Sequence, residues 1–357
     1  MPAAAAAVLR FSSLGDVLLA AHLPCFLRRV NPAQRVLFVT KERHGAVLRG
    51  HPDIDRLYML RDDSADPAAP APFGFRGGLP DLVAALRLEG LRELYDVHGT
   101  FRSSRVLGAF PEAKRVVAEK HAIRRRLWVH ARWLKPAPVP PILETYRAIA
   151  GLPSDAPLRP WLRDALSPEE RRRADALVSG GPPFVLLSVG ARWRTKRWPL
   201  RHFAELARAI GRELGLSCRF AIAPGEEEVR AELEALLSEA GRRSMDAQPL
   251  RAVAALAANA QAIVSNDSAV LHLGPALGVP AVGLFGSTVP EFGFAWQSRR
   301  DAAVGIPLPC RPCDVHGRDR CPLRHHDCME RLEPGAVLDA LKGVLDAGRG
   351  STKGRAS

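Results

Sequence analysis

Short apolar runs that alternate with helix-like stretches constrain this chain most strongly. The run FVLLSV at 184–189, for example, precedes an amphipathic stretch at 199–214. Strands that are apolar throughout, each followed by a helix, are typical of parallel sheets covered on both faces. Strands are expected at 6–11, 35–40, 56–60, 94–97, 114–118, 184–189, 217–223, 261–265 and 281–285. The pattern therefore predicts an α/β fold of doubly wound parallel sheets.

A chain of 357 residues exceeds the usual size of a single domain. Residues 151–168 contain four prolines and lie where a linker between two domains belongs. We therefore expect an N-terminal domain at 1–150, a linker at 151–168 and a C-terminal domain at 169–335, followed at 336–357 by a helix and a disordered basic tail. The Pro-, Ala- and Gly-rich segment 61–80 predicts a long loop within the first domain.

The net charge of +13 favours an acidic partner: nucleic acid, a phosphorylated small molecule or an anionic membrane surface. Solubility together with arginine-rich codon usage would produce the same surplus. The longest stretch without Lys, Arg, Asp or Glu, at 268–290, contains three prolines and four glycines, which suits buried strands and turns better than a membrane-spanning helix. We expect a cytoplasmic protein without a transmembrane segment.

The first candidate loop is Ser12-Ser13-Leu14-Gly15-Asp16, directly after the first strand. Gly15 permits a tight turn, and Asp16 stands at the start of a helix, where backbone N–H groups stabilise an anion. The acid can be a helix cap, or it can be a reactive carboxylate at the carboxyl edge of the sheet. No GxGxxG follows the strand and no GxxxxGK[ST] occurs, so neither a dinucleotide dehydrogenase nor a P-loop phosphotransferase is supported.

Two further loops carry charges after strands of the second domain. GARWRTKRWP at 190–199 presents four cations, including Lys196, before a helix that starts near Pro199, and this arrangement suits a diphosphate as well as a solvated basic loop. Glu226 follows the strand at 217–223. A carboxylate there can hold ribose hydroxyls, or it can simply complement the helix dipole.

The fourth loop region, SNDSAVLHLGPALGVPAVGLFGST at 265–288, brings polar residues to two neighbouring strand ends. Asp267 and Ser268 start a helix, and His272 lies far enough along it to turn back toward the same end. A capped helix with a core histidine is the alternative. Gly286-Ser287-Thr288 follows the next strand and adds hydroxyls and backbone donors, which favours a binding site.

Four cysteines near the C-terminus, Cys310, Cys313, Cys321 and Cys328, have the spacing CxxC-x7-C-x6-C with three histidines nearby. They could bind zinc, but the spacing is not that of a common zinc module. A reduced structural cluster or a redox artefact is favoured over a metal site, and the sequence leaves metal binding by these cysteines open.

Together these loops resemble the heptosyltransferases, glycosyltransferase family 9, over almost the whole chain. The resemblance is carried by RFSSLGDVLLAAHLPCFLRRVNP, FVTKERHGAVLRGHPDIDRL, YDVHGTFRS, GARWRTKRWPLRHFAELA, SNDSAVLHLGPALGVPAVGLFGST and CRPCDVHGRDRCPLRHHDCM. It implies a GT-B fold, two Rossmann-like domains facing a central cleft, and inverting transfer without an essential metal or cofactor. The implied donor is ADP-L-glycero-β-D-manno-heptose, and the implied acceptor is a hydroxyl of the lipopolysaccharide inner core, on Kdo–lipid A or heptosyl-Kdo–lipid A.

The resemblance also implies residue roles. Asp16 matches the catalytic aspartate, expected to act as base with a near-normal pKa. Lys196 matches a lysine that contacts the donor diphosphate, and Glu226 lies near an acid proposed to hold the ribose. The remaining implied donor residues are Asp267, Ser268, His272 and Thr288. From their location alone, Ser13, Arg102, Lys120 and Arg124 of the first domain are expected to bind the anionic acceptor.

This chain departs from the family pattern at Val189-Gly190, where Pro-Gly is frequent, and at Ser287, where FGPT is frequent. These departures leave the preferred sugar nucleotide open. Two alternatives remain: another GT-B nucleotide-sugar transferase or sugar-nucleotide epimerase, and a non-enzymatic basic nucleic-acid binder. The latter is disfavoured because no nucleic-acid motif occurs and only 6% of residues are aromatic. The excess positive charge would hold the enzyme at the anionic surface of the inner membrane.

Overall fold

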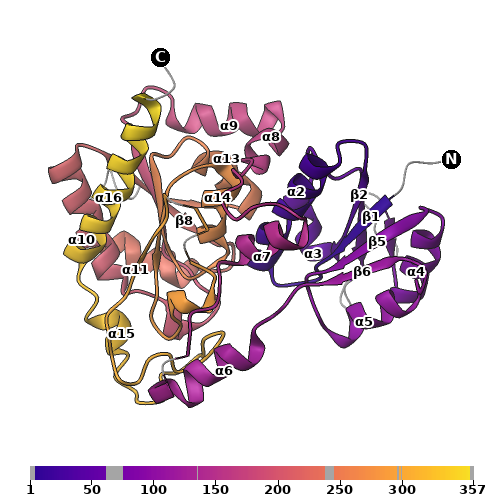
Figure 1. The fold of residues 1–357 in the computed structure, drawn as a ribbon. Helices are drawn as coiled ribbons and strands as arrows, with labels where there is room; N and C mark the ends of the chain where they lie inside the picture. The colour runs from indigo at the N-terminus through magenta and orange to yellow at the C-terminus, as the bar shows by residue number, and fades with distance from the viewer. Residues whose placement is uncertain are drawn as a thin grey trace. The chain divides into compact units, whose positions relative to one another are not determined.

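The computed structural model describes residues 5–61, 75–134, 136–237, 245–295, 297–298 and 300–353. The chain divides into two units (Figure 1). Unit 1 comprises Met1–Lys120 and Ile142–Ser167, and unit 2 comprises His121–Pro141 and Pro168–Ser357.

Unit 1 is built on a six-stranded parallel sheet with the order β4-β3-β2-β1-β5-β6. Its strands are β1 (Ala5–Leu9), β2 (Arg35–Lys41), β3 (Arg56–Leu60), β4 (Phe75–Gly77), β5 (Leu91–Asp96) and β6 (Lys114–Val117). Its helices are α1 (Leu14–Ala20), α2 (His22–Val30), α3 (Glu42–Gly45), α4 (Leu79–Arg87), α5 (Phe101–Gly108), α7 (Ile142–Ile149) and α8 (Trp161–Ala165), with the 3₁₀ turn η1 (Ala46–Leu48).

Side chains on both faces of this sheet are buried, because alternate residues of the strands point to opposite faces. All five residues of β1 are buried. Ala5, Ala7 and Leu9 pack with apolar residues of α4 and α5. The helices α1, α2 and α7 pack against one another, with α2 against β2. Burial on both faces explains why the strands are apolar throughout.

Unit 2 contains a second six-stranded parallel sheet, with the order β12-β11-β10-β7-β8-β9. Its strands are β7 (Phe184–Ser188), β8 (Ser217–Ile222), β9 (Met245–Ala247), β10 (Ala262–Asn266), β11 (Ala281–Leu284) and β12 (Ala302–Val304). Its helices are α6 (Ala122–His130), α9 (Pro168–Val178), α10 (Leu200–Leu214), α11 (Glu227–Leu236), α13 (Leu250–Ala257), α14 (Leu273–Leu277), α15 (Asp327–Glu330) and α16 (Pro334–Lys353). Its 3₁₀ turns are η2 (Arg132–Leu134), η3 (Arg194–Lys196), η4 (Ala269–His272) and η5 (Pro290–Phe292).

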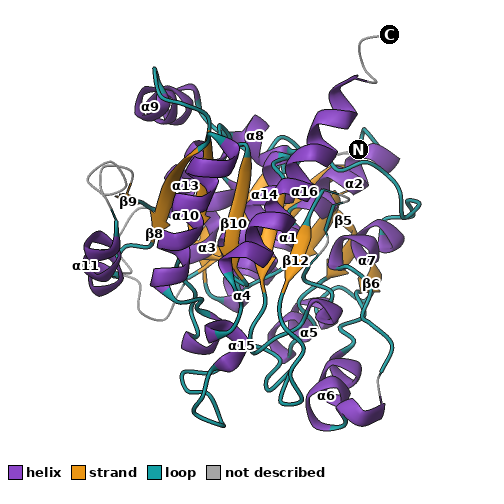
Figure 2. Ribbon diagram, turned by 90° about the vertical axis from the view of Figure 1, so that its left-hand side faces the viewer, coloured by secondary structure: helices purple, strands orange, loops and turns teal. Residues whose placement is uncertain are grey.

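The helices of unit 2 form two layers around its sheet. Helix α10 packs against α11 and α16, whereas α13 packs against α9 and α14 (Figures 1 and 2). Helix α10 begins after Pro199 and ends at Leu214, followed by Gly215, whose φ of 64° is left-handed. Trp198, just before α10, is fully buried, packs edge-on against Phe203 and donates its indole N–H to the Leu332 carbonyl at 2.8 Å. This anchoring fixes the loop that precedes α10.

The observed boundaries differ from the predicted domains in two places. Residues 121–141, expected in the N-terminal domain, belong to unit 2, and residues 151–167, expected as a linker, belong to unit 1. The prolines in the second segment are typical of a linker, but they surround Trp161 and Leu162, which are both fully buried. The predicted terminal helix is α16, whereas residues 354–357 of the predicted tail lie outside the described residues. Residues 62–74 of the predicted loop at 61–80 also lie outside them.

Candidate functional site

Each sheet has one point at which the strand order changes direction, and the polar loops gather there. In unit 1 this point lies between β1 and β5, and in unit 2 it lies between β7 and β10. Open α/β sheets bind ligands outside the carboxyl ends of the strands at such a switch point. The sequence-predicted loops after β1, β7 and β10 therefore occupy the positions at which a doubly wound sheet forms a site.

Asp16 lies in the first turn of α1, immediately after β1. Its Oδ2 accepts hydrogen bonds from the backbone N–H of Ser13 at 3.1 Å and from the Ser13 hydroxyl at 2.7 Å. The same oxygen lies 2.7 Å from the Arg10 guanidinium. All of these contacts use Oδ2, and Oδ1 accepts no hydrogen bond from the residues that the structure describes. The carboxylate thus combines a capping contact with one oxygen that can accept a proton.

The electrostatic surroundings of Asp16 differ from the sequence-based expectation of a near-normal pKa. Burial favours the neutral acid, but the Arg10 guanidinium and the hydrogen bonds from Ser13 outweigh burial and lower the pKa to about 2. The side chain of Asp16 is 21% exposed, so it remains open to solvent. Asp16 is therefore ionised across the physiological range.

The loop after β5 lies beside the loop after β1. The Asp96 carboxylate caps this loop by accepting the N–H groups of His98 and Gly99 at 2.8 and 2.7 Å. The His98 ring packs edge-on against Phe11, with 5.2 Å between ring centroids. Burial, with Arg10 and Lys120 nearby, lowers the pKa of His98 to about 4, so the imidazole is neutral at pH 7. His98 was missed as a site residue, although it lies within the quoted stretch YDVHGTFRS.

The four predicted acceptor residues separate into two groups. Ser13 is bonded to Asp16, Lys120 donates to the Gly99 carbonyl at 2.6 Å, and Arg102 is exposed in the first turn of α5. These three lie after β1, β6 and β5, at the same edge of the unit 1 sheet. Arg124 does not belong with them, because it lies on α6, which packs with unit 2.

Lys120 lies against Gly99, so a larger residue at position 99 would displace the Lys120 side chain. Gly99 has a φ of 57°, and a Cβ at this position would lie 2.7 Å from Lys120 Cε. The loop after β5 and the loop after β6 are therefore packed tightly against one another at the edge that carries Asp16.

In unit 2, the structure brings together three of the predicted donor residues. Lys196 Nζ lies 2.6 Å from Asp267 Oδ2, and the Thr288 hydroxyl donates to the same oxygen at 2.7 Å. Lys196 follows β7, Asp267 follows β10 and Thr288 follows β11. The side chains of Lys196 and Asp267 are only 13% and 11% exposed. Burial opposes ionisation of Asp267, but Lys196, Thr288 and His272 outweigh it and lower the pKa of the carboxyl group.

Ser268 and His272 lie close to this ion pair in the chain. Ser268 precedes η4, and its hydroxyl lies 3.1 Å from the Ser265 hydroxyl. The His272 ring is buried at the junction of η4 and α14. His272 also contributes to lowering the pKa of Asp267.

Glu226 takes a defined position at the end of β8. Its Oε2 accepts the backbone N–H of Ala223 at 3.1 Å, and its Oε1 lies 3.6 Å from the Arg197 guanidinium. A Cβ at Gly190 would lie 2.6 Å from Glu226 Oε2. The small residue after β7 therefore leaves room for the Glu226 carboxylate beside the basic loop.

Sequence reasoning missed the polar network that supports the basic loop of unit 2. The Thr195 hydroxyl donates to the Arg318 carbonyl at 2.8 Å and lies 3.1 Å from the Ser287 hydroxyl. Arg311 donates to the carbonyls of Phe285 and Thr288 at 2.7 and 3.0 Å. These contacts join segments more than twenty residues apart, and no local sequence pattern predicts them.

The C-terminal cysteines are present as free thiols, together with Cys25 and Cys218. Within the described residues, no group of three or more His, Cys, Asp or Glu side chains is arranged to hold a metal ion. Burial raises the pKa of the Cys328 thiol to about 12, so this thiol is protonated at neutral pH.

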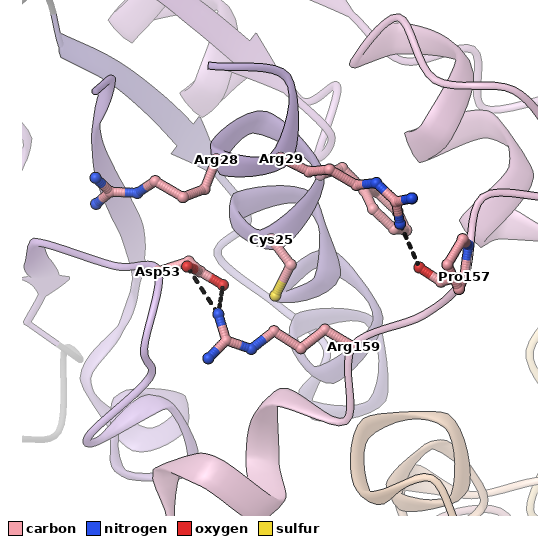
Figure 3. Close-up of a pocket in the computed structure, with 7 residues that line it drawn as sticks. Cys25, Arg28, Arg29, Asp53, Pro157 and Arg159 are labelled. Atoms are coloured by element: carbon pink, nitrogen blue, oxygen red, sulfur yellow. Dashed lines mark hydrogen bonds and ion pairs between the residues drawn. The ribbon is translucent and has the colours of Figure 1, made fainter. Parts of the chain in front are cut away.

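A cavity of about 320 Å³ in unit 1 lies away from these loops (Figure 3). Arg159 reaches across it to both oxygens of Asp53, at 3.1 and 2.9 Å, and Arg29 points toward the Pro157 carbonyl (Figure 3). Asp53 precedes β3, at the amino-terminal edge of the sheet, opposite the edge of Asp16. The ion pair between Arg159 and Asp53 ties the proline-rich segment to unit 1.

Two parallel doubly wound sheets with polar loops at both switch points define a class of protein. This architecture is GT-B, the fold of one large group of nucleotide-sugar glycosyltransferases. The sequence model for "Glycosyltransferase family 9 (heptosyltransferase)" matches residues 81–321. The chain belongs to glycosyltransferase family 9.

Relatives and solved structures agree with this assignment. Lipopolysaccharide heptosyltransferase 1 of Pseudomonas aeruginosa is 34% identical over 177 residues, which are 46% of this chain and 49% of that protein. Lipooligosaccharide heptosyltransferase 2 of Campylobacter jejuni is 27% identical over 173 residues, 47% of this chain and 53% of that protein. The matched region thus spans about half the length of these relatives.

Among solved structures, Escherichia coli ADP-heptose lps heptosyltransferase II superposes with a TM-score of 0.68 at 21% identity, covering 98% of this chain and 100% of that one. A family 9 glycosyl transferase from Veillonella parvula gives 0.73 at 18% identity, covering 97% and 98%. At these identities the likeness shows the fold. Among the described residues, no helix is long and apolar enough to span a bilayer.

Proposed function

We propose that this protein transfers heptose, with inversion, from ADP-L-glycero-β-D-manno-heptose to a hydroxyl of the lipopolysaccharide inner core. The observation that carries the proposal is the cluster of Lys196, Asp267 and Thr288 at the switch point of unit 2, matched by Asp16 at the switch point of unit 1. The relatives named above are heptosyltransferases of lipopolysaccharide or lipooligosaccharide. A solved Escherichia coli heptosyltransferase, WaaC with ADP, has the same fold, with a TM-score of 0.65.

Asp16 is proposed to accept the proton of the acceptor hydroxyl. Inverting transfer is a single in-line displacement: the acceptor oxygen bonds to the anomeric carbon, the bond to the diphosphate oxygen breaks, and the hydroxyl proton passes to the base. A carboxylate with a pKa of about 2 is too weak a base to deprotonate a free sugar hydroxyl. It can take the proton only as the new bond forms, when the hydroxyl becomes strongly acidic.

Arg10 has a defined part in this proposal. Its contact with Oδ2 keeps Asp16 ionised and leaves Oδ1 for the acceptor hydroxyl. Arg10 also donates to the Val97 carbonyl at 2.5 Å, so it connects the loops after β1 and β5. Arg10 is thus proposed as a residue that positions the base.

The donor diphosphate is proposed to bind at Lys196 and the backbone N–H groups at the start of α10. In the structure Lys196 already has a carboxylate partner, Asp267. A bound diphosphate must therefore compete with Asp267 for the ammonium group or share it. Glu226, at the end of β8, is proposed to accept hydrogen bonds from the ribose hydroxyls, as carboxylates in similar positions do in dinucleotide folds. Ser268 and His272 are proposed to complete the donor pocket.

Transfer without a metal ion is also part of the proposal, because the cationic loop can neutralise the leaving diphosphate. One solved protein of similar fold, TibC from enterotoxigenic Escherichia coli, is an iron-containing glycosyltransferase, with a TM-score of 0.52 at 14% identity. Metal dependence therefore needs a direct test. Activity that survives extensive dialysis against EDTA supports the proposal, and activity that disappears and returns with added metal refutes this part of it.

The decisive experiment measures transfer from ADP-heptose to purified inner-core acceptor by wild-type protein, by Lys196→Ala and by Arg201→Ala. Arg201 is an exposed cation on α10 that pairs with Glu330, so its variant controls for loss of positive charge. Lys196→Ala should weaken ADP binding in calorimetry, whereas Arg201→Ala should not. Equal ADP affinity of Lys196→Ala and wild type would remove Lys196 from the donor site.

A panel of ADP-, UDP- and GDP-sugars separates this proposal from other GT-B chemistry. A ligand present at about 100 times its dissociation constant stabilises the protein by roughly 2.7 kcal/mol, which a thermal-shift assay resolves. Stabilisation by ADP-heptose alone supports the proposal. Turnover of a UDP-sugar without any acceptor would instead identify an epimerase.

The proposed acceptor is anionic and lipid-linked. Ser13, Arg102 and Lys120 lie at the edge of unit 1 that carries Asp16, and they are proposed to contact its phosphates and carboxylates. Such an enzyme works in the cytoplasm at the inner-membrane surface, and nucleic acid has no part in the reaction.

A further inference from the structure

Helix α6 and the turn η2 expose large apolar side chains on the surface of unit 2. Ile123 is 75% exposed, Leu127 38%, Trp133 77% and Leu134 53%. Ile123 and Leu127 are four residues apart and so lie on one face of α6. Soluble proteins expose single apolar residues freely, but a cluster on one short segment marks an interaction surface. We call these four residues the α6 patch.

The opposite face of α6 is fixed to unit 2. Val129 is buried in a small apolar cluster with Val289 and Phe292. Arg125 donates to the Phe292 carbonyl at 2.9 Å, and its guanidinium lies 4.5 Å from the centre of the Phe294 ring. The α6 patch is therefore held on a structured helix whose inner face is already occupied.

The charge of residues 120–143, which include α6 and η2, indicates which kind of partner the α6 patch would bind. Residues 120–143 contain no Asp or Glu, but they contain six Lys or Arg residues. Arg126 and His130 are exposed on α6. Basic residues beside exposed Ile, Leu and Trp side chains suit a segment that lies in the headgroup region of an anionic membrane. Trp133 supplies the amphipathic ring that favours the membrane–water interface.

We propose that the α6 patch docks the protein onto an anionic lipid bilayer, with the apolar side chains in the headgroup region and Arg126 near the lipid phosphates. The inference concerns a surface on unit 2 and is separate from the residues assigned to transfer. It rests on the proposed function in one respect only, namely that a lipid-linked acceptor gives the protein a reason to reach the membrane. Bilayer binding itself can be measured without any transfer.

The test uses the full chain and sedimentation with vesicles of phosphatidylglycerol and phosphatidylethanolamine. The patch variant is Ile123→Ser/Leu127→Ser/Trp133→Ser. All three side chains are at least 38% exposed, so the substitutions should disturb the packing of unit 2 little. Partition onto these vesicles should fall roughly tenfold or more. Arg126→Glu should weaken binding to the anionic vesicles and leave the weaker binding to phosphatidylcholine vesicles unchanged, because it alters only the electrostatic attraction.

The matched control is Val30→Ser/Leu88→Ser/Leu323→Ser, which removes three exposed apolar residues elsewhere on the surface. It should bind vesicles as the wild type does. Equal loss in the control and patch variants, or unchanged binding of the patch variant, would overturn the proposal. The proposal would also be overturned if the wild-type chain does not bind vesicles but forms a dimer that the patch substitutions abolish. The α6 patch would then be a contact surface for a second copy of the chain.

Two further measurements show whether lost vesicle binding comes from the missing side chains or from misfolding of the patch variant. The fluorescence of wild type minus that of Trp133→Phe isolates the emission of Trp133, which brominated lipids in the vesicle should quench. Transfer to a delipidated, water-soluble acceptor should be the same in the patch variant and the wild type. If neither the wild type nor the patch variant transfers heptose, but the vesicle-binding results are as expected, the proposed function is wrong and the docking surface is still supported.

Discussion

The buried ion pair between Lys196 and Asp267 leads to a quantitative prediction. Lys196→Met removes the ammonium group 2.6 Å from Asp267 Oδ2 and keeps a side chain of similar length. Of the two groups that contact Asp267 Oδ2 in this cluster, only the Thr288 hydroxyl remains, and it donates a hydrogen bond at 2.7 Å. Its side chain is 11% exposed, so water replaces the lost cation poorly. Removing one member of a buried pair costs about 3–5 kcal/mol, because a charge is left uncompensated.

The sign of the pH dependence follows from Asp267. In the wild type its pKa lies below the reference value of 3.8, so the carboxylate contributes stability above that pH and loses it in acid. In Lys196→Met, burial acts without the cation and raises the pKa above the reference value. The variant should therefore recover stability relative to wild type as the pH falls from about 7 toward about 4.

The assay is chemical or thermal unfolding of Lys196→Met, Asp267→Asn and the double variant, followed in the transition of unit 2. A loss of about 3 kcal/mol corresponds to a fall in Tm of roughly 6–12 °C for a unit of this size. The double variant has no buried charge, so it should be more stable than Lys196→Met, with a coupling energy of roughly 2 kcal/mol.

An exposed pair supplies the control. Lys342 Nζ lies 2.8 Å from Glu213, with side chains 38% and 44% exposed. Lys342→Met should cost much less stability than Lys196→Met, because exposed pairs contribute little. If Lys196→Met costs no more than Lys342→Met, or if the double variant shows the sum of the single losses, the reasoning from burial is wrong.

Three further outcomes are expected. Asp16→Asn should reduce transfer roughly 10³-fold, as expected for loss of a general base, and leave ADP affinity unchanged in calorimetry; near-normal turnover would end its assignment as base. Burial lowers the pKa of His22 to about 3 and that of His51 to about 4. Both must stay neutral in the fold, so stability should fall below pH ~6.5, by roughly 2 kcal/mol per histidine at about pH 5, and flat stability in a denaturation series from pH 7 to pH 5 would contradict this. Gly190→Ala places a Cβ within 2.6 Å of Glu226 and should raise the dissociation constant of ADP about tenfold, roughly 1.4 kcal/mol, in calorimetry; an unchanged constant would separate Glu226 from the ribose.

The strands could be predicted from the sequence because their burial on two faces leaves continuous apolar runs. The run at 184–189 became β7, Phe184–Ser188, and the run at 56–60 became β3, Arg56–Leu60. The short edge strands β4, β9 and β12 were missed, because three residues at the edge of a sheet carry no such pattern.

The division into units could not be predicted from composition. The prolines at 151–168 indicate a linker, and nothing local shows that Trp161 and the ion pair of Arg159 with Asp53 fasten the segment to unit 1. Likewise, Lys196 and Asp267 are 71 residues apart, and Thr195 and Arg318 are 123 apart. The loops of a doubly wound sheet can be placed at one edge from the strand pattern, but which side chains meet there depends on the packing of every strand between them.

Asp16 combines a structural and a proposed chemical role in one side chain. The sequence left two alternatives, a helix cap and a reactive carboxylate. The structure shows the capping contacts, because the backbone N–H and the hydroxyl of Ser13 both donate to Oδ2, and the role as base stays a proposal. The cap does not compete with a role as base; it holds the carboxylate in place. The contact with Arg10 lowers the pKa to about 2, a feature that the turn sequence alone did not predict. In the proposed mechanism a base so weak restricts proton transfer to the moment of bond formation. Arg10→Met should therefore raise the pKa of Asp16 and move the acid limb of the rate profile to higher pH.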